Sequence, residues 1–221
     1  MNTMKPVRSD TARTRKSLLA AAIEVFAAKG YRDTTIGDIC IRARTNVASV
    51  NYHFGDKETL YVEAWRRAFS ESMKTHPPDG GVSPDASPED RLRGQISALM
   101  HRIADESNKE FLIVMKELST PTGLLEEVMR EELHPLQKRM EGVVRELLGP
   151  HASDLEVRLC EASIISQCLG PMRGQRERRK ADGLPPRFDV ETFSDHVFKF
   201  SLAGIRAIRK DVEKRQRGLK K

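Results

Sequence analysis

The sequence predicts an all-α protein in which a small N-terminal three-helix domain precedes a larger helical domain. Apolar residues recur at helical spacing in successive segments, and no segment shows the strict alternation of a half-buried strand. A stretch rich in proline and glycine, residues 77–88, interrupts this pattern and cannot be helical. We therefore expect residues 1–76 to form the first domain and residues 77–221 the second.

The first domain opens with a helix over residues 17–29. Its apolar residues have helical spacing, and Gly30 supplies the left-handed conformation of a helix stop. Thr34 and Thr35 offer side-chain oxygens that can cap a second helix, which ends near residues 44–45. These short elements predict two helices joined by a tight turn.

Two more capped helices follow at once. Asn46 is a good N-cap for a helix over residues 47–54, and Asp56 caps another helix from Lys57 to about His76. The arrangement of short helix, turn and short helix predicts a helix-turn-helix, a shape that enters the major groove of DNA.

The second domain shows only helical patterns. The segment 122–148 is expected to bend or break at Pro135, and the charged residues 173–186 to form a solvated connection or, alternatively, a second contact with the DNA backbone. The expected helices cover residues 89–107, 109–119, 122–148, 154–169 and 190–216.

Cysteine usage and hydropathy limit the class of protein. Cys40, Cys160 and Cys168 are too scattered for a disulfide framework or a zinc site, so we expect buried thiols, with no metal and no cofactor. No run of about 18 apolar residues occurs, and the basic N-terminus lacks an apolar core. We therefore expect a cytoplasmic protein without a membrane partner.

Charge is distributed unevenly along the chain. Residues 1–76 hold 13 Lys and Arg against 8 Asp and Glu, residues 77–172 hold 10 against 17, and residues 173–221 hold 15 against 7. Basic ends on an acidic middle suit a phosphate-binding module attached to a regulatory domain, although ordinary surface charge also accounts for the pattern.

The helix over residues 47–54 carries groups suited to reading bases. Val47, Ala48 and Asn51 stand at i, i+1 and i+4 and share one face. Asn51 can form the bidentate pair with adenine, and the two small apolar side chains can touch a thymine methyl. Val50 and Phe54 stand on the other side, so we expect them to pack inward.

Polar side chains surround that face and can hold phosphates, which fixes position rather than sequence. Tyr52 has an open alternative, because its ring can also belong to the core while its hydroxyl reaches a phosphate. The helix starting at Lys57 directs its N-terminal amides outward as a further phosphate site. The expected positioning residues are Thr35, Thr45, Ser49, Tyr52, His53 and Lys57.

Residues 14–65 resemble the N-terminal domain of the TetR family of bacterial transcriptional regulators. The resemblance lies in the segments 26–31, 34–39 and 51–61, which together form a specific signature. It implies a helix-turn-helix regulator that binds duplex DNA. The DNA-contacting positions that it implies are Thr35, Thr45, Asn46, Val47, Ala48, Ser49, Asn51, Tyr52, His53 and Lys57.

Arg44 departs from the family pattern, which has a turn glycine at this position. A left-handed backbone costs a non-glycine residue about 1 kcal/mol, so the turn geometry is in question. Arg44 would also lie close to the DNA backbone and could add a phosphate contact, and we include it among the expected DNA-binding residues.

The second half is similar to the C-terminal domain of the CecR-like branch of the TetR family, through residues 159–169 and 200–205. The helices there have more apolar surface than a monomer covers, and small residues would let partner helices approach closely. Burial in the monomer's own core is the alternative. The residues expected at a two-fold dimer interface are Ala162, Ser163, Ser166, Ala203 and Gly204.

A small-molecule effector is expected in the second domain, with an unknown identity. Flexible methionines combined with a few polar groups are typical of an adaptable pocket, although such methionines are also ordinary core residues. The candidate ligand-binding residues are Met100, His101, Met115, Met129, His134, Cys160 and Gln167.

Together these observations predict a ligand-responsive repressor that binds a palindromic DNA operator as a homodimer. The sequence lacks a GxSxG elbow, a phosphate-binding GxxxxGK, an HExxH pair and a dinucleotide-binding GxGxxG, so we expect no enzyme. A helical adaptor or structural protein without sequence-specific DNA binding is the alternative.

Overall fold

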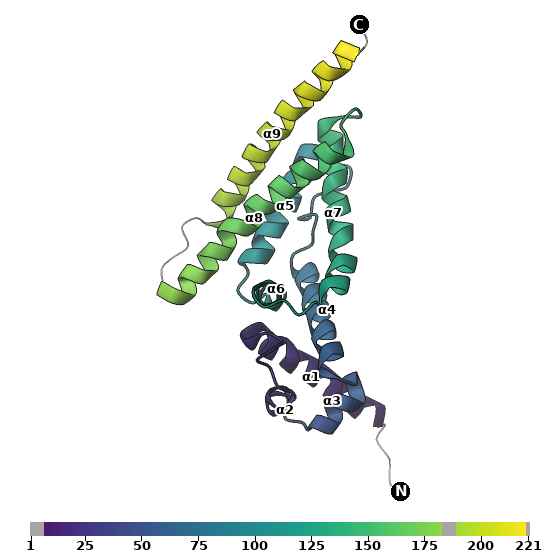
Figure 1. The fold of residues 1–221 in the computed structure, drawn as a ribbon, viewed down its shortest axis with the longest axis vertical. Coiled ribbons are helices and arrows are strands. Elements are labelled where there is room, and N and C mark those ends of the chain that lie inside the picture. Colours follow the sequence, from purple (N-terminus) through teal and green to yellow (C-terminus); the bar gives the residue numbers. More distant parts are fainter. Residues whose placement is uncertain (1–6, 183–188, 220–221) are drawn as a thin grey trace. The chain divides into compact units, whose positions relative to one another are not determined.

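The computed structural model describes the backbone of residues 7–182 and 189–219. Within these ranges the chain forms nine helices and no strand, which confirms the all-α prediction (Figure 1). None of the described helices is long and apolar enough to cross a membrane. The helices are α1 (Val7–Lys29), α2 (Ile36–Ala43), α3 (Val47–Phe54), α4 (Lys57–Thr75), α5 (Pro88–Ala104), α6 (Lys109–Ser119), α7 (Glu126–Leu148), α8 (Asp154–Asp182) and α9 (Val190–Leu219).

The helices group into two compact units. The first unit contains the residues up to Ser72 together with Ser107–Arg130, and the second contains Met73–Glu106 and the residues from Glu131 onward. The segment 107–130, which includes α6, thus packs with the N-terminal helices. The division of function between residues 1–76 and 77–221 stays a prediction.

The first unit is built around α1, which packs against α2, α3 and α6. Apolar side chains from different helices, including Phe26, Ile39, Val50 and Leu60, are fully buried in its core. Val50 and the buried Phe54 confirm that one side of α3 faces inward. Burial of a side chain of this size stabilises the fold by about 1.5–3 kcal/mol, so the core fixes α3 firmly.

Capping residues set the start of α2. The Oγ1 atom of Thr35 accepts the backbone N–H of Asp38 at 3.1 Å, while the Asp38 carboxylate accepts the N–H of Thr35 at 3.0 Å, which makes a capping box. Thr34 does not share this role. Its buried hydroxyl donates instead to the carbonyl of Gly30 at 2.6 Å and closes the end of α1.

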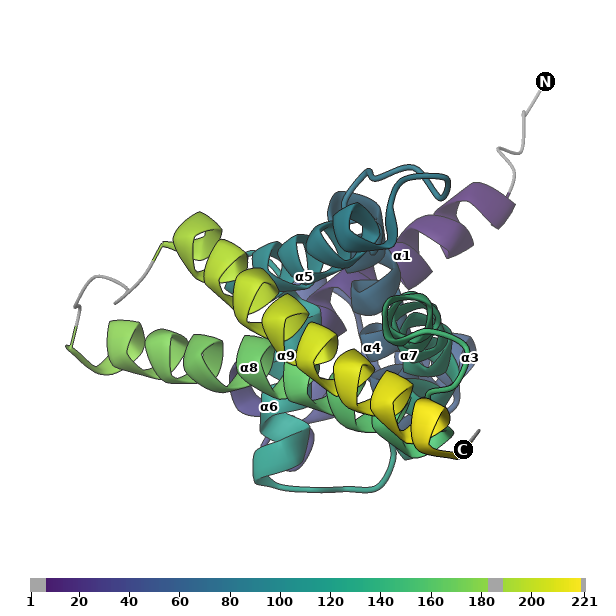
Figure 2. The same ribbon diagram turned by 90° about the horizontal axis from the view of Figure 1, so that it is seen from above.

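The second unit is formed by α5, α8 and α9, which pack against one another, with the greater part of α7. Figure 2 shows α9 crossing over α8. Ile96, Val157 and Val197 from three of these helices are buried. Cys160 and Cys168 of α8 are buried free thiols, as is Cys40 in the first unit, in agreement with the sequence.

The loop between α4 and α5 is held by backbone packing against α5. Gly80 and Gly94 lie close together: a Cβ atom built on Gly80 would approach the carbonyl oxygen of Gly94 to 2.5 Å, and one built on Gly94 would approach the carbonyl oxygen of Asp79 to 2.5 Å. Gly80 also has a φ of 64°, in the left-handed region. The proline-rich loop of the sequence prediction is therefore packed along a defined path on the helix.

Several predicted helix boundaries are corrected by the structure. The helix expected from Thr122 begins at Glu126, and α7 continues through Pro135 without a break. Pro135 is exposed, so water can satisfy the carbonyl that proline leaves without a partner. Residues 173–182 continue α8 and are not a loop, because Arg and Lys are good helix formers. Residues 183–188 lie outside the described residues.

Candidate nucleic-acid interface

The turn between α2 and α3 forms with arginine in the position of the usual glycine. Arg44 has φ 53° and ψ 49°, and it is the only non-glycine residue with positive φ in the described part of the chain. The N–H groups of Arg44 and Thr45 donate to the carbonyls of Ile41 at 3.2 Å and Cys40 at 3.0 Å. The exposed Arg44 side chain therefore comes with a strained backbone.

A side-chain cap starts α3 at the predicted residue. The Oδ1 atom of Asn46 accepts the backbone N–H of Ser49 at 3.0 Å and the Ser49 hydroxyl at 3.1 Å. The Thr45 hydroxyl donates in turn to the Ser49 hydroxyl at 3.0 Å. This small network fixes Thr45 and Ser49, both half-buried, at the edge of the helix.

The outer face of α3 is exposed, as a base-reading face must be. Val47 is 51% exposed and Tyr52 is 77% exposed, which excludes the core alternative for Tyr52. Ala48 and Asn51 are exposed between them. The helix therefore separates a buried side, used for packing, from a free side that presents an amide and small apolar groups.

Polar groups also lie on α2 and at the end of α3. Thr35, the cap of α2, is exposed, and His53 is half-buried with its ring 5.0 Å from that of Tyr52. Hydrogen bonds from Thr35 and the ammonium group of Lys29 lower the pKa of Asp38 to about 2, so this carboxylate is ionised at neutral pH.

The start of α4 differs from the expected open phosphate site. The carboxylate of Asp56 accepts the N–H of Thr59 at 2.7 Å, and this bond lowers the pKa of Asp56. A negative group thus occupies the helix N-terminus, where we expected amides to receive phosphate. Lys57, the first residue of the helix, is half-buried.

Arg15 is a further basic residue near α3 that the sequence did not single out. Its guanidinium lies 4.8 Å from the centre of the Phe54 ring and pairs with Glu63 of α4. These contacts join α1 to the end of α3 and to α4. No local pattern reveals them, because Arg15 and Glu63 are far apart in the sequence.

The predicted ligand-binding residues are divided between the two units. Met115 and Met129 belong to the first unit, and the other five belong to the second. Met100 and Cys160 are buried, and His134 is exposed. Gln167 is half-buried, and its amide donates to the Ser201 hydroxyl at 3.3 Å.

His101 is engaged with neighbouring polar groups. Its Nδ1 atom lies 2.8 Å from the carbonyl oxygen of Ser97, and its Nε2 atom lies 2.9 Å from the Glu191 carboxylate. No group of three or more metal-binding side chains occurs among the described residues.

Gln95, which the sequence did not single out, is buried in α5 with an Oε1 atom that has no hydrogen-bond partner.

The five predicted interface residues are all exposed in the single chain. Ala162, Ser163 and Ser166 lie on α8, and Ala203 and Gly204 lie on α9. The single chain therefore does not bury them in its own core.

Large apolar side chains are exposed on the same two helices. Leu155, Leu159 and Leu169 of α8 and Phe200 of α9 are between 37% and 64% exposed. With the five small residues they define what we call the α8–α9 face. Exposed apolar surface of this kind is typical of interfaces.

Comparisons with known proteins match both parts of the chain. Residues 18–64 match the family of bacterial regulatory proteins of tetR type, and residues 88–205 match the C-terminal domain of the HTH-type transcriptional dual regulator CecR. CecR of Shigella flexneri is 26% identical over 165 residues, which cover 70% of this chain and 74% of CecR. The repressor NicS of Pseudomonas putida is 33% identical over 58 residues, which are 26% of this chain and 27% of NicS.

Solved structures share the fold. FadR of Bacillus subtilis, solved in complex with stearoyl-CoA, has a TM-score of 0.67 at 18% identity, covering 86% of this chain and 98% of FadR. A putative fatty acid metabolism regulator of Clostridium perfringens has a TM-score of 0.66 at 18% identity, covering 85% of this chain and 97% of that one. The helix-turn-helix geometry of α2 and α3 and the match over residues 88–205 lead to one conclusion: the chain belongs to the TetR family of transcriptional regulators, in its CecR-like branch.

Proposed function

We propose that this TetR-family regulator is a homodimeric repressor that binds a palindromic operator through α3 and is released by a small molecule. The observation that carries the proposal is the free face of α3, where Val47, Ala48, Asn51 and Tyr52 are exposed together while Val50 and Phe54 are buried. A helix whose buried side is packed in the core and whose other side is exposed can enter a major groove without refolding.

The proposal divides the interface residues by role. Asn51 reads an adenine, and Val47 and Ala48 touch thymine methyl groups. Phosphates are held around these bases by groups that fix the register of the protein on the duplex. The proposed phosphate-binding residues are Thr35, Arg44, Thr45, Asn46, Ser49, Tyr52, His53 and Lys57.

A homodimer explains the exposed α8–α9 face. Small residues on both helices would let the same helices of a second copy approach closely, and the exposed leucines and Phe200 would be covered. A two-fold protein then matches a palindromic site and doubles the number of phosphate contacts, which supports repression by occupancy of the operator.

The ligand is proposed to bind within residues 77–221. Structural likeness to a regulator solved with stearoyl-CoA supports a small-molecule role. Gln95 is a candidate in addition to the predicted residues, because its buried Oε1 atom can accept a hydrogen bond from a ligand. Release from DNA requires that the ligand bind two states of the dimer with different affinity.

Footprinting of the purified protein on the DNA upstream of its own gene tests the proposal. We expect a protected palindrome whose affinity falls steeply with salt and exceeds the affinity for random duplex. Equal affinity for both duplexes, or no salt dependence, would favour a helical adaptor. The same footprint repeated with a panel of toxic compounds tests the ligand response, and at least one compound should remove protection.

A further inference from the structure

The ammonium group of Lys57 lies 4.2 Å from the centre of the Tyr31 ring. Lys57 is the first residue of α4 and follows the end of α3 after two residues, whereas Tyr31 lies in the turn after α1. A cation over an aromatic face is attracted by the electron density of the ring. The basic group at the start of α4 is therefore held by a residue of another segment.

Buried rings fix Tyr31 in its turn. Its ring stacks on Phe26 with centres 6.3 Å apart and lies 5.1 Å from the ring of Tyr61. Tyr61 is fully buried and meets the Phe26 ring edge-on at 4.7 Å. The ring of Tyr31 cannot turn without disturbing this cluster, since packed rings occupy defined positions.

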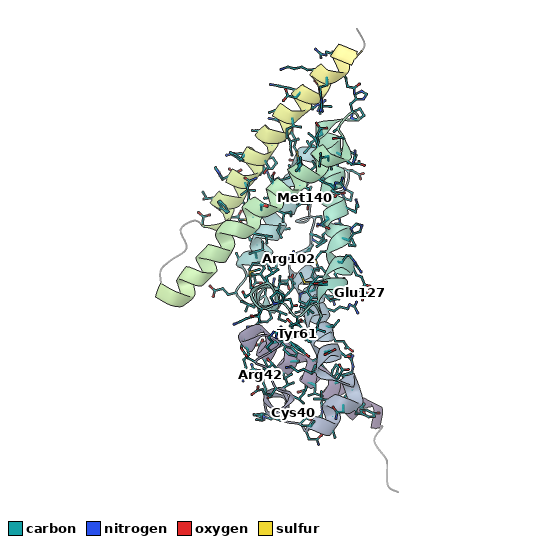
Figure 3. All side chains as sticks on the ribbon, in the orientation of Figure 1. Cys40, Arg42, Tyr61, Arg102, Glu127 and Met140 are labelled. Atoms are coloured by element: carbon teal, nitrogen blue, oxygen red, sulfur yellow. The ribbon has the colours of Figure 1, made fainter. Side chains whose placement is uncertain are left out.

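A buried carboxylate of α6 fixes Tyr61 in turn. The Tyr61 hydroxyl donates to Oε2 of Glu117 at 3.0 Å, and Tyr61 is labelled in Figure 3. Oε1 of Glu117 accepts the N–H of Thr122 at 2.8 Å and the N–H of Gly123 at 3.1 Å. Such bonds are required to keep a buried carboxylate stable. Burial and the nearby Glu117 charge raise the pKa of Tyr61, so its hydroxyl stays protonated and remains a donor.

We infer that Tyr31, Tyr61 and Glu117 are positioning residues that hold the Lys57 ammonium group ready for a DNA phosphate. The inference rests on the proposed DNA-binding function and adds three residues to it. The set, which we call the Tyr31–Tyr61–Glu117 array, lies wholly within the first unit. It links the proposed phosphate contact to Glu117 of α6, 60 residues further along the chain, and to the turn at residues 122–123.

The physical reason is the flexibility of lysine. Its ammonium group stands on a four-carbon stem, and ordering that stem on a phosphate costs conformational entropy. A ring that already restricts the stem reduces this cost, because the group is preorganised before DNA arrives. The Lys57 contact gains importance because the Asp56 carboxylate already accepts the N–H of Thr59, one of the first amides of α4.

The test compares Tyr31→Leu with Tyr31→Phe in the full-length protein. Phenylalanine keeps the ring, whereas leucine removes it at similar volume. Binding to a random-sequence duplex is measured at increasing KCl, together with thermal unfolding of each variant. We expect Tyr31→Phe to bind within about 2-fold of wild type and Tyr31→Leu to bind about 2- to 10-fold more weakly.

The salt dependence separates positioning from general damage. Affinity falls as salt rises, and Lys57→Ala should make this dependence less steep: the magnitude of the slope of log affinity against log salt should fall by about one for each Lys57 that contacts the duplex. Tyr31→Leu should also make the salt dependence less steep. The double variant Tyr31→Leu with Lys57→Ala should bind no more weakly than Lys57→Ala alone. Tyr61→Phe, which removes only the hydroxyl, should weaken binding in the wild-type background and have no effect with Lys57→Ala.

The outcomes distinguish the two levels of the proposal. If the wild-type protein shows no salt-dependent binding to duplex, the proposed DNA-binding function fails. If it binds but Tyr31→Leu matches wild type or binds more tightly, the array does not position Lys57. The inference would also be overturned if the affinity losses of Tyr31→Leu and Lys57→Ala multiplied in the double variant. If Tyr31→Leu does not fold, Tyr61→Phe replaces it in the same comparison with Lys57→Ala.

Discussion

Asn46 and Ser49 are joined twice, because one side-chain oxygen of Asn46 accepts both the backbone N–H and the hydroxyl of Ser49, at 3.0 and 3.1 Å. The bond to the N–H starts α3, and the bond to the hydroxyl orients a polar group at the edge of the proposed DNA-reading face. Stability of the helix and geometry of the interface therefore depend on the same residue.

Substitution of Asn46 should separate these two roles. Asn46→Ala loses the cap and should destabilise the protein by about 0.5–2 kcal/mol. Asn46→Asp keeps an equally good cap but adds a negative charge, so its unfolding temperature should match wild type while its affinity for any duplex falls. Thermal denaturation and duplex binding measure the two effects, and normal DNA binding by Asn46→Asp would place Asn46 away from the phosphates.

Asn51→Ala should relax sequence preference at one base pair in each half-site. Loss of a bidentate pair with adenine costs about 1–3 kcal/mol at that position and leaves random duplex binding almost unchanged. Lys57→Ala is the matched control, since loss of a phosphate contact weakens all duplexes alike. Competition between operator variants with each base pair changed makes the comparison, and identical profiles for both variants would refute the division into reading and positioning residues.

Arg44→Gly should stabilise the protein and weaken its DNA binding. Glycine adopts the φ of 53° without the cost paid by arginine, a gain of about 0.5–1 kcal/mol. The loss of the charge should reduce affinity and flatten its salt dependence. Arg44→Asn is the control, because asparagine tolerates this conformation and also lacks the charge, so it should bind DNA as weakly as Arg44→Gly. Unchanged binding by both variants would remove Arg44 from the interface.

Acid should loosen α2 through Asp38. Its pKa is about 2 in the folded protein against an ordinary value of 3.8, so the carboxylate stabilises the fold above pH 3.8 and loses this contribution as the pH falls toward 2. Amide exchange at Thr35 and Asp38, followed by NMR from pH 5 to pH 2, should show α2 opening in this window. Asp38→Asn should show a smaller change across the same range, and equal curves for both proteins would contradict the assignment.

Charged substitutions on the α8–α9 face should split the proposed dimer. Leu159→Arg and Phe200→Arg place a charge on residues that are 57% and 64% exposed in the single chain. Leu118 of α6 is 59% exposed and provides a matched control in the first unit. Sedimentation should show monomers for the first two variants and a dimer for Leu118→Arg, because an unpaired charge at the centre of an interface is strongly unfavourable. Dimers for all three would place the interface elsewhere.

Features determined by neighbouring residues were predictable from the sequence. The caps at Thr35, Asn46 and Asp56 all form, because each depends on a side chain and an amide within three residues. The buried side of α3 followed from the spacing of Val50 and Phe54. The exposed positions of Val47 and Asn51 agree with the same reasoning.

Features that depend on distant residues were not predictable. Glu117 reads as an ordinary charged residue at the end of an amphipathic helix, yet it is buried and bonded to Tyr61, 56 residues earlier. The packing of residues 107–130 with the N-terminal helices has no local signal either. The ligand site stays a prediction for a related reason. Its candidate residues were grouped by residue type, and residue type does not say which residues lie close together: Met115 and His134 belong to different units.

The close packing of Gly80 on Gly94 limits how this chain can vary. A methyl group at residue 94 would collide with the backbone of the preceding loop, which would have to lift from α5 and lose its path along the helix. Homologues or engineered variants that keep this packing should therefore tolerate residues inserted at 83–86, beyond the Gly80–Gly94 contact, far better than a side chain at Gly80 or Gly94.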